Sequence, residues 1–195
     1  MTLTLDTPHF TVRTLEVTDA GGKLREWFAD PEIMFPLNLP HRLVPLPDMA
    51  AYIGGFDRRT RFLLGIEQKR GGVLCGFWII KTEPRGRTAT LDLMVDPRLP
   101  TAALAAMESM VTVGDWLAGL GVEKGIANMR PENRKGRRLM QFMGVPEEGL
   151  LREEVPEQTG LGGRLDIHRF GLPARLWPAT RARILDRLEA LQGVL

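Results

Sequence analysis

Three strand-like runs joined by tight turns constrain the fold of this 195-residue chain more than any other feature. Residues 61–69 and 73–82 are mostly apolar and are separated by Arg70-Gly71-Gly72, a sequence typical of a hairpin turn. Pro84-Arg85-Gly86 marks a second turn before the third run, residues 87–96. Because a tight turn joins only antiparallel neighbours, the three runs predict a β-meander.

The periodicity changes after the meander. Residues 101–119 have apolar side chains at helical spacing and a thin polar side, which predicts a helix buried against the sheet. A strand is expected at 122–129 and a helix from Pro131 to about Met143. With the shorter runs at 10–15, 150–155 and 164–170 as further strands, the pattern predicts a mixed α/β sheet with helices on its faces.

Composition excludes several classes of protein. With 44% hydrophobic and 26% charged residues, the chain is neither disordered nor fibrous. No apolar run reaches the roughly 18 residues that span a bilayer, and residues 1–6 do not look like a secretory signal. The single cysteine, Cys75, suits a reducing compartment, so we expect a cytoplasmic protein. A net charge of +2 argues against nucleic-acid binding, and the three scattered histidines predict no metal site.

The junction between the third meander strand and the long helix is a candidate anion site. Thr101 is the expected N-cap of this helix. The first N–H groups of a helix lack internal partners and carry the positive end of its dipole, so they can bind phosphate oxygens. Alanines at 102, 103 and 105 would allow a ligand to approach the backbone closely. Alanine is also the best helix former, so the same residues fit a merely buried helix.

From this junction outward, the chain resembles the GNAT-type N-acetyltransferases, nearest the branch of ribosomal-protein-alanine and spermidine acetyltransferases. The likeness spans residues 10–170 and follows the order of elements. Its motifs are Phe10-Thr11-Val12-Arg13-Thr14-Leu15 with Asp19, Ala29-Asp30-Pro31-Glu32, residues 73–80 with Gly76, Asn133, Gly144-Val145, and Glu148-Gly149-Leu150-Leu151-Arg152.

The resemblance implies a mostly antiparallel, seven-stranded mixed sheet that is splayed in the middle, with helices on both faces. It implies a GNAT-like domain over 1–171 and a C-terminal helical extension over 172–195. The implied activity is transfer of an acetyl group from acetyl-CoA to a primary amine, on a small molecule or a protein N-terminus, by direct attack. The implied coenzyme-binding residues are Val95, Thr101, Ala102, Ala103, Leu104, Ala105, Asn133, Arg134 and Arg137.

The chain departs from this family at several positions. Pro100, Ala103 and Ala105 stand where members carry Arg or Gln followed by two glycines, and proline removes a backbone N–H there. Gly136 replaces a common serine, and Met140 replaces the tyrosine that many members use as general acid. The alternative prediction is therefore a GNAT-like binding or regulatory module without catalysis.

Asp92 is the first candidate for general base. It shares a strand face with Thr88, Thr90 and Met94, although it also fits an ordinary solvent-facing strand residue. Glu83, near the preceding turn, is a weaker alternative. The resemblance implies that the proline-rich loop 34–47 and the helix after it shape the acceptor pocket, with Phe35, Tyr52 and Phe56 as its lining. Asn128 could orient the substrate or the coenzyme, or it could satisfy local backbone groups.

The basic cluster Arg130, Arg134, Lys135, Arg137 and Arg138 also has two interpretations: a solvated helix face, or a group that supplies at least one contact to the coenzyme phosphates. The final helical segment places Ile184, Leu185, Leu188 and Leu191 on one face. This face would either pack on the chain's own domain or form a homodimer contact.

Overall fold

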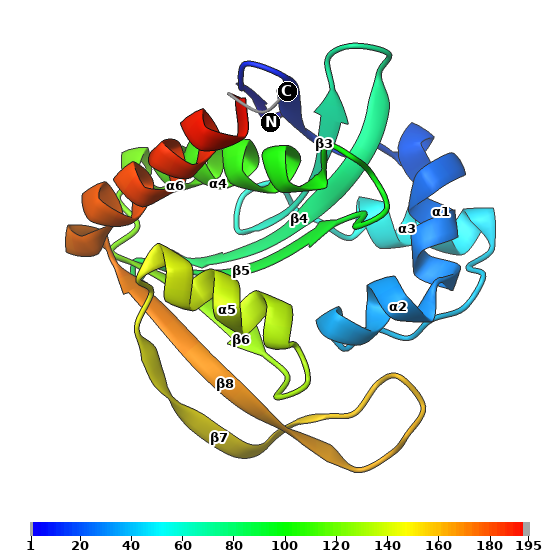
Figure 1. Cartoon of the computed structure of the whole chain (residues 1–195). Helices are drawn as coiled ribbons and strands as arrows, with labels where there is room; N and C mark the ends of the chain where they lie inside the picture. Colours follow the sequence, from blue (N-terminus) through cyan, green and yellow to red (C-terminus); the bar gives the residue numbers. More distant parts are fainter. Residues whose placement is uncertain (1, 193–195) are drawn as a thin grey trace.

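Eight strands form one mixed sheet in the order β1-β2-β3-β4-β5-β6-β8-β7, as the computed structural model shows for residues 2–192 (Figure 1). Seven strands were expected from the sequence. The additional strand is the short β1, whose three residues pair with β2 but are too few to show an alternating pattern. The strands are β1 (Thr4–Asp6), β2 (Phe10–Thr14), β3 (Arg61–Gln68), β4 (Val73–Glu83), β5 (Thr88–Val95), β6 (Lys124–Met129), β7 (Glu147–Pro156) and β8 (Arg164–Pro173).

The predicted meander is confirmed: β3, β4 and β5 pair antiparallel in sequence order. Gly71 and Gly72 have φ angles of 92° and 63°, so the first turn needs the left-handed conformations that glycine adopts without strain. Of the described strand pairs, only β5 and β6 run parallel, because α4 (Ala102–Gly119) carries the chain back between them.

The sheet is splayed in its middle, as predicted. β5 and β6 pair only through Thr88–Thr90 and Lys124–Ile126. Beyond these residues β5 stays paired with β4 as far as Val95, and β6 stays paired with β8 as far as Met129. The two central strands therefore part, and we call the space between their unpaired ends the gap.

Helices cover both faces of the sheet (Figure 1). One face carries α1 (Gly22–Ala29), α2 (Pro31–Met34) and α3 (Leu46–Gly54), and the other carries α4, α5 (Arg134–Met143) and α6 (Trp177–Gln192). Short 3-10 turns η1 (Val17–Ala20), η2 (Phe35–Leu37) and η3 (Ala174–Leu176) complete the chain. Alternation along β4 supplies both cores, since Phe77 and Ile79 pack with α1–α3 while Trp78 and Ile80 pack toward α4.

Helix α6 packs on its own chain. Ile184 and Leu188 of the expected apolar face are buried, and Trp177 lies so close to α4 that a Cβ on Gly114 would be 2.3 Å from its ring. The Trp177 indole N–H also donates to Asp115 at 2.9 Å. A homodimer contact through α6 and a domain boundary after residue 171, which falls within β8, stay predictions.

Candidate functional site

The gap exposes main-chain groups of β5. The Asp96 N–H donates to the Cys75 carbonyl at 2.9 Å, and these two residues lie directly beyond the Gly76–Val95 pair, the last of the β4–β5 register. Because hydrogen-bonded pairs alternate along antiparallel strands, the N–H and C=O groups of Leu93 and Val95 point away from β4. They point into the gap, where β6 no longer pairs with them.

On the face that carries α1–α3, the gap opens into a cavity of about 120 Å³, which we call the polar cavity. Asp92 of β5 and Asn128 of β6 line it from opposite sides of the gap, so the structure brings these two predicted residues together. Asn38 ties this wall to the β7–β8 loop through hydrogen bonds of 3.0 Å to Pro156 and Gln158. The lining residues are Pro36, Leu37, Asn38, Asp92, Asn128, Arg130, Val155 and Ile167.

The Asp92 carboxyl is suited to accept a proton. Burial raises its pKa, and the positive charge of Lys81 only partly offsets this effect. Tyr52 is close enough to respond to the Asp92 charge: burial and then that charge raise the pKa of Tyr52 to about 12. A carboxylate with a raised pKa is a stronger base than a solvated one, which is what a proton acceptor for an ammonium group needs.

Arg130 is a member of the polar cavity that the sequence analysis grouped with the basic cluster of the following helix. The structure separates it from that cluster, because α5 begins only at Arg134. Arg130 is 2% exposed and stacks 3.8 Å from the centroid of the Phe35 ring. Its guanidinium also lies 3.4 Å from Glu157 of the β7–β8 loop. Only its position directly after a strand distinguished it in the sequence from the helical arginines.

The remaining candidates do not line the polar cavity. Tyr52 and Phe56 pack edge-to-face with centroids 5.3 Å apart, and Phe56 is 7% exposed, so it belongs to the core around α3. Phe35 supports Arg130. Glu83 is exposed at the end of β4, where it accepts the Arg85 N–H at 3.1 Å, and it does not line the polar cavity.

The start of α4 offers free N–H groups on the other face of the sheet. Ala102 N–H donates to Leu99 and Ala105 N–H donates to Thr101, at 3.0 and 2.8 Å. The N–H groups of Ala103 and Leu104 have no partner within residues 2–192. Thr101 occupies the N-cap position, as predicted, but its side chain makes no capping hydrogen bond.

Asp96 and Arg98 fix the turn before α4. Asp96 is 3% exposed and accepts hydrogen bonds from the Arg98 side chain at 2.8 Å and from the Trp27 indole at 3.0 Å. The hydrogen bond from Arg98 is the largest cause that lowers the pKa of Asp96, to about 2. Arg98 also bridges to Asp30 at 2.9 Å, so this turn is tied directly to α1 and α2.

The start of α5 is capped by its own sequence. The Asn133 side chain accepts the Gly136 N–H at 2.9 Å. A Cβ on Gly136 would be 2.9 Å from both the Asn133 amide and the Met129 sulfur, which explains glycine in place of the family's serine. Of the predicted phosphate contacts, Arg134 is exposed and Arg137 is half-buried with an Nε that has no partner.

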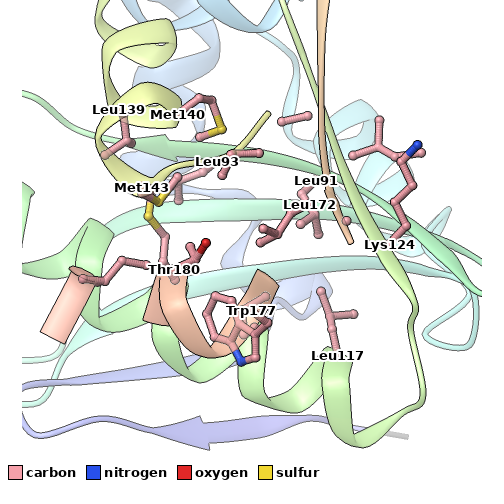
Figure 2. A pocket seen from close by; sticks show the side chains of 18 of the residues that line it. Leu91, Leu93, Leu117, Lys124, Leu139, Met140, Met143, Leu172, Trp177 and Thr180 are labelled. Carbon is pink, nitrogen blue, oxygen red and sulfur yellow. The ribbon is translucent and has the colours of Figure 1, made fainter. Parts of the chain in front are cut away.

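A second and larger cavity, of about 220 Å³, lies on the face that carries α4–α6, and we call it the apolar cavity (Figure 2). Leu93 and Met129 line it where β5 and β6 part. Asn133, Gly136 and Met140 of the predicted coenzyme region line it as well. Figure 2 shows Leu91, Leu93 and Leu172 from the sheet facing Met143 of α5 and Trp177 of α6.

These features fit a coenzyme A molecule. The free N–H groups of Ala103 and Leu104 suit its diphosphate, and the unpaired edge of β5 suits the amide groups of its pantetheine arm. Within residues 2–192, no three His, Cys, Asp or Glu side chains gather into a metal-binding group, and no helix is long and apolar enough to cross a membrane.

Comparison with known proteins identifies the fold. No protein-family model matches the sequence, and a search of curated proteins finds no match either. Among solved structures, a GCN5-related N-acetyltransferase from Brucella melitensis has a TM-score of 0.80 at 15% identity, over 95% of this chain and 85% of that one.

Two more solved structures are similar. Spermidine N-acetyltransferase from Vibrio cholerae has a TM-score of 0.73 at 18% identity, over 88% of this chain and 99% of that one. RimJ from Mycobacterium smegmatis has a TM-score of 0.72 at 17% identity, over 95% and 93%. This chain therefore has the fold of the GNAT acetyltransferases, in agreement with the resemblance in its sequence.

Proposed function

We propose that this protein is an acyl-CoA-dependent N-acetyltransferase that moves an acetyl group from acetyl-CoA to a primary amine. The observation that carries the proposal is the pair of cavities on opposite faces of one gap. Asp92 lines one cavity and its neighbour Leu93 lines the other, so a donor and an acceptor can meet between them. Two structures with this fold support the proposal: the spermidine acetyltransferase is a complex with CoA and spermine, and RimJ is a complex with CoA-disulfide.

Acetyl-CoA supplies an activated acyl group as a thioester. The roles of the chain's own residues follow from their positions. Asp92, as a carboxylate, attracts the acceptor's ammonium group and takes its proton, directly or through one water. Asn128, on the facing strand, orients the amine by a hydrogen bond. The main-chain N–H groups of Leu93 and Val95 in the gap supply donors where negative charge develops on the carbonyl oxygen.

Atoms balance in this scheme. The ammonium group gives one proton to Asp92 before attack. One N–C bond then forms and one C–S bond breaks, and the second proton released by the nitrogen passes through solvent to the departing sulfur. The raised pKa of Asp92 favours this transfer, because a carboxylate of ordinary pKa is a poor base toward an ammonium group. The acceptor is a primary amine on a small molecule or a protein N-terminus, and we expect it to be met in the cytoplasm.

Calorimetric titration with acetyl-CoA and with coenzyme A tests donor binding. A ligand at 100 times its dissociation constant stabilises the folded state by about 2.7 kcal/mol, so a melting scan checks the result independently. Ala103→Glu should weaken binding at least tenfold, because it places a negative charge beside the proposed diphosphate site. The matched control, Ala182→Glu on an exposed position of α6, should leave binding unchanged.

Turnover is tested by the release of free thiol in the presence of spermidine, an alanyl peptide and further primary amines. Release that depends on the amine supports the transferase. Because Pro100 and Met140 replace functional residues of the family, a non-catalytic binding module is the second candidate. Binding without thiol release from any amine would favour that candidate, and absence of binding would contradict both.

A further inference from the structure

The apolar cavity is larger than an acetyl group needs. An acetyl group has a single methyl beyond its carbonyl carbon, whereas a cavity of about 150 Å³ already holds a benzene molecule. The cavity here is about 220 Å³. Its walls are mainly hydrocarbon from β4, β5, β6, β8, α4, α5 and α6, with Leu91, Leu117, Met143, Leu172 and Trp177 among the larger side chains.

The position of the apolar cavity separates it from the phosphate region. None of residues 100–105 lines it. It starts at Leu93 and Met129, beside the gap, and continues under the second half of α4, where Val113 and Leu117 cover it. Trp177 and Ile184 of α6 line this far part, so a ligand that enters from the gap would extend away from the start of α4.

One polar group of the cavity wall has no partner. The indole N–H of Trp78, a residue that is 5% exposed, makes no hydrogen bond within residues 2–192. By contrast, Lys124 pairs with Glu148 at 2.7 Å and Asn133 caps α5. Trp78 lies opposite Leu93 in the β4–β5 register, hence near the gap. A buried N–H without a partner is costly, so the part of the cavity wall beside the gap is less purely hydrocarbon than the part under α4 and α6.

From these observations we propose that the apolar cavity binds the acyl chain of a donor longer than acetyl, with about six to eight carbons. This inference rests on the proposed function and adds the class of acyl group to it. The carbonyl end lies at the gap near Trp78, and the hydrocarbon tail lies under α4 and α6. The reaction is unchanged: the acyl carbon leaves sulfur for nitrogen, the amine loses one proton and the sulfur gains one.

Binding of a chain-length series tests the proposal without any turnover. Calorimetry and tryptophan fluorescence, to which Trp78 and Trp177 of the cavity wall contribute, are recorded with CoA and with its acetyl, butyryl, hexanoyl and octanoyl thioesters. Each buried methylene favours binding by about fourfold. The wild type should therefore bind octanoyl-CoA at least tenfold more tightly than acetyl-CoA. Octanoate without CoA is measured as a separate arm.

A single glycine allows the cavity to be filled. A Cβ on Gly125 would be 3.4 Å from the nearest Leu91 atom and 4.0 Å from Leu172, and valine suits a strand. Gly125→Val should bring the affinity for octanoyl-CoA to within threefold of that for acetyl-CoA, and leave acetyl-CoA binding unchanged. Gly119→Val, at the end of α4 with nothing within 4 Å of its Cβ, is the matched control and should behave as the wild type.

Each outcome decides the proposal. Tighter binding of longer thioesters that Gly125→Val removes supports an acyl-chain site. Equal or weaker binding of longer thioesters, with acetyl-CoA still bound, overturns the acyl-chain site and leaves the transferase intact. Octanoate binding that octanoyl-CoA does not share would also overturn it, since the cavity would then serve a free carboxylic acid. If no thioester binds at all, the proposed function itself fails.

Discussion

The gap between β5 and β6 opens into a different cavity on each face of the sheet. On the α1–α3 side, the polar cavity of about 120 Å³ holds Asp92, Asn128 and Arg130. On the α4–α6 side, the apolar cavity of about 220 Å³ is lined mainly by hydrocarbon. The difference arises from alternation along two strands, because Asp92 adjoins Leu93 and Asn128 adjoins Ala127 and Met129.

In the proposed function, proton transfer and donor binding take place on opposite faces of the sheet. A charged amine is stabilised where carboxylate and amide oxygens are available, whereas a thioester and its chain are protected where water is excluded. A register slip of one residue in β5 or β6 would move the side chains of that strand from one cavity to the other. A substitution on the polar face should therefore change the rate of proton transfer, and a substitution on the apolar face should change the binding of the donor.

Replacing Asp92 by Asn should have the largest effect, on the polar face. We expect kcat/KM to fall by about 10²–10⁴, the usual contribution of a positioned base. In the wild type the rate should rise with pH as Asp92 loses its proton, above the ordinary carboxyl pKa of 3.8, because burial raises that pKa. The variant should lose this dependence in a pH–rate profile.

Stability separates a catalytic from a structural effect of the same change. Since the folded-state pKa of Asp92 is raised, the folded protein binds this proton more tightly than the unfolded chain does. The stability that protonated Asp92 contributes to the folded protein is lost as pH rises from 3.8 through the folded-state pKa. Asp92→Asn should therefore melt at the same or a higher temperature at pH 7. A loss of activity with Glu83→Gln and not with Asp92→Asn would assign the base to Glu83.

Replacing Asp96 by Ala should destabilise the turn that joins β5 to α4, because Asp96 bonds this turn to Trp27 of α1. It leaves the buried Trp27 indole N–H without its acceptor, which costs about 1–3 kcal/mol. For a chain of this size, each kcal/mol lowers Tm by about 2–4 °C, measurable by calorimetry. The pKa of Asp96 is lowered, so its contribution is present above pH 3.8 and is lost as pH falls through about 2.

Glu26→Ala, a change at an exposed carboxylate paired with Lys23, is the control for Asp96→Ala. We expect a much smaller change in Tm, because exposed ion pairs contribute about 0–1 kcal/mol. Equal losses for the two variants would contradict a special role of Asp96.

Replacing Pro100 by Arg should have the smallest effect, on the apolar face. It restores a backbone N–H and a cation at the turn that precedes α4, so coenzyme A should bind about threefold to tenfold more tightly by calorimetry. Pro97→Arg, an exposed position in the same turn, is the matched control and should change affinity less. Unchanged binding by Pro100→Arg would place the diphosphate elsewhere.

Much of the fold could be predicted because its signals are local. The turn residues Arg70-Gly71-Gly72 and Pro84-Arg85-Gly86 predicted the meander, and helical spacing in residues 101–119 predicted α4. The strand β1 was missed since it is defined by its pairing with β2 across the Thr7–His9 turn and not by its own three residues. Whether the apolar face of α6 was buried by this chain depended on tertiary contacts that no local pattern shows.

The candidate site, too, could be predicted only in part from the sequence. The period of two placed Asp92 on one face of its own strand, and Asn128 was a separate candidate near the end of the next strand. The structure adds that the two strands part just before these residues and that both line one cavity. Arg130 looked like one of several helical arginines, although its side chain lies on the opposite side of the gap from α5. Its role depends on Phe35 and Glu157, which are distant in sequence and become neighbours only after folding.

A crystal structure of the protein with coenzyme A tests the central claim most directly. We predict diphosphate oxygens at the N–H groups of Ala103 and Leu104, the pantetheine arm along the free edge of β5, and the sulfur in the gap between Leu93 and Met129. The Asp92 carboxylate should face that sulfur from the other side of the gap. A coenzyme bound elsewhere, or a gap closed by side chains in crystals soaked with the coenzyme, would contradict the account.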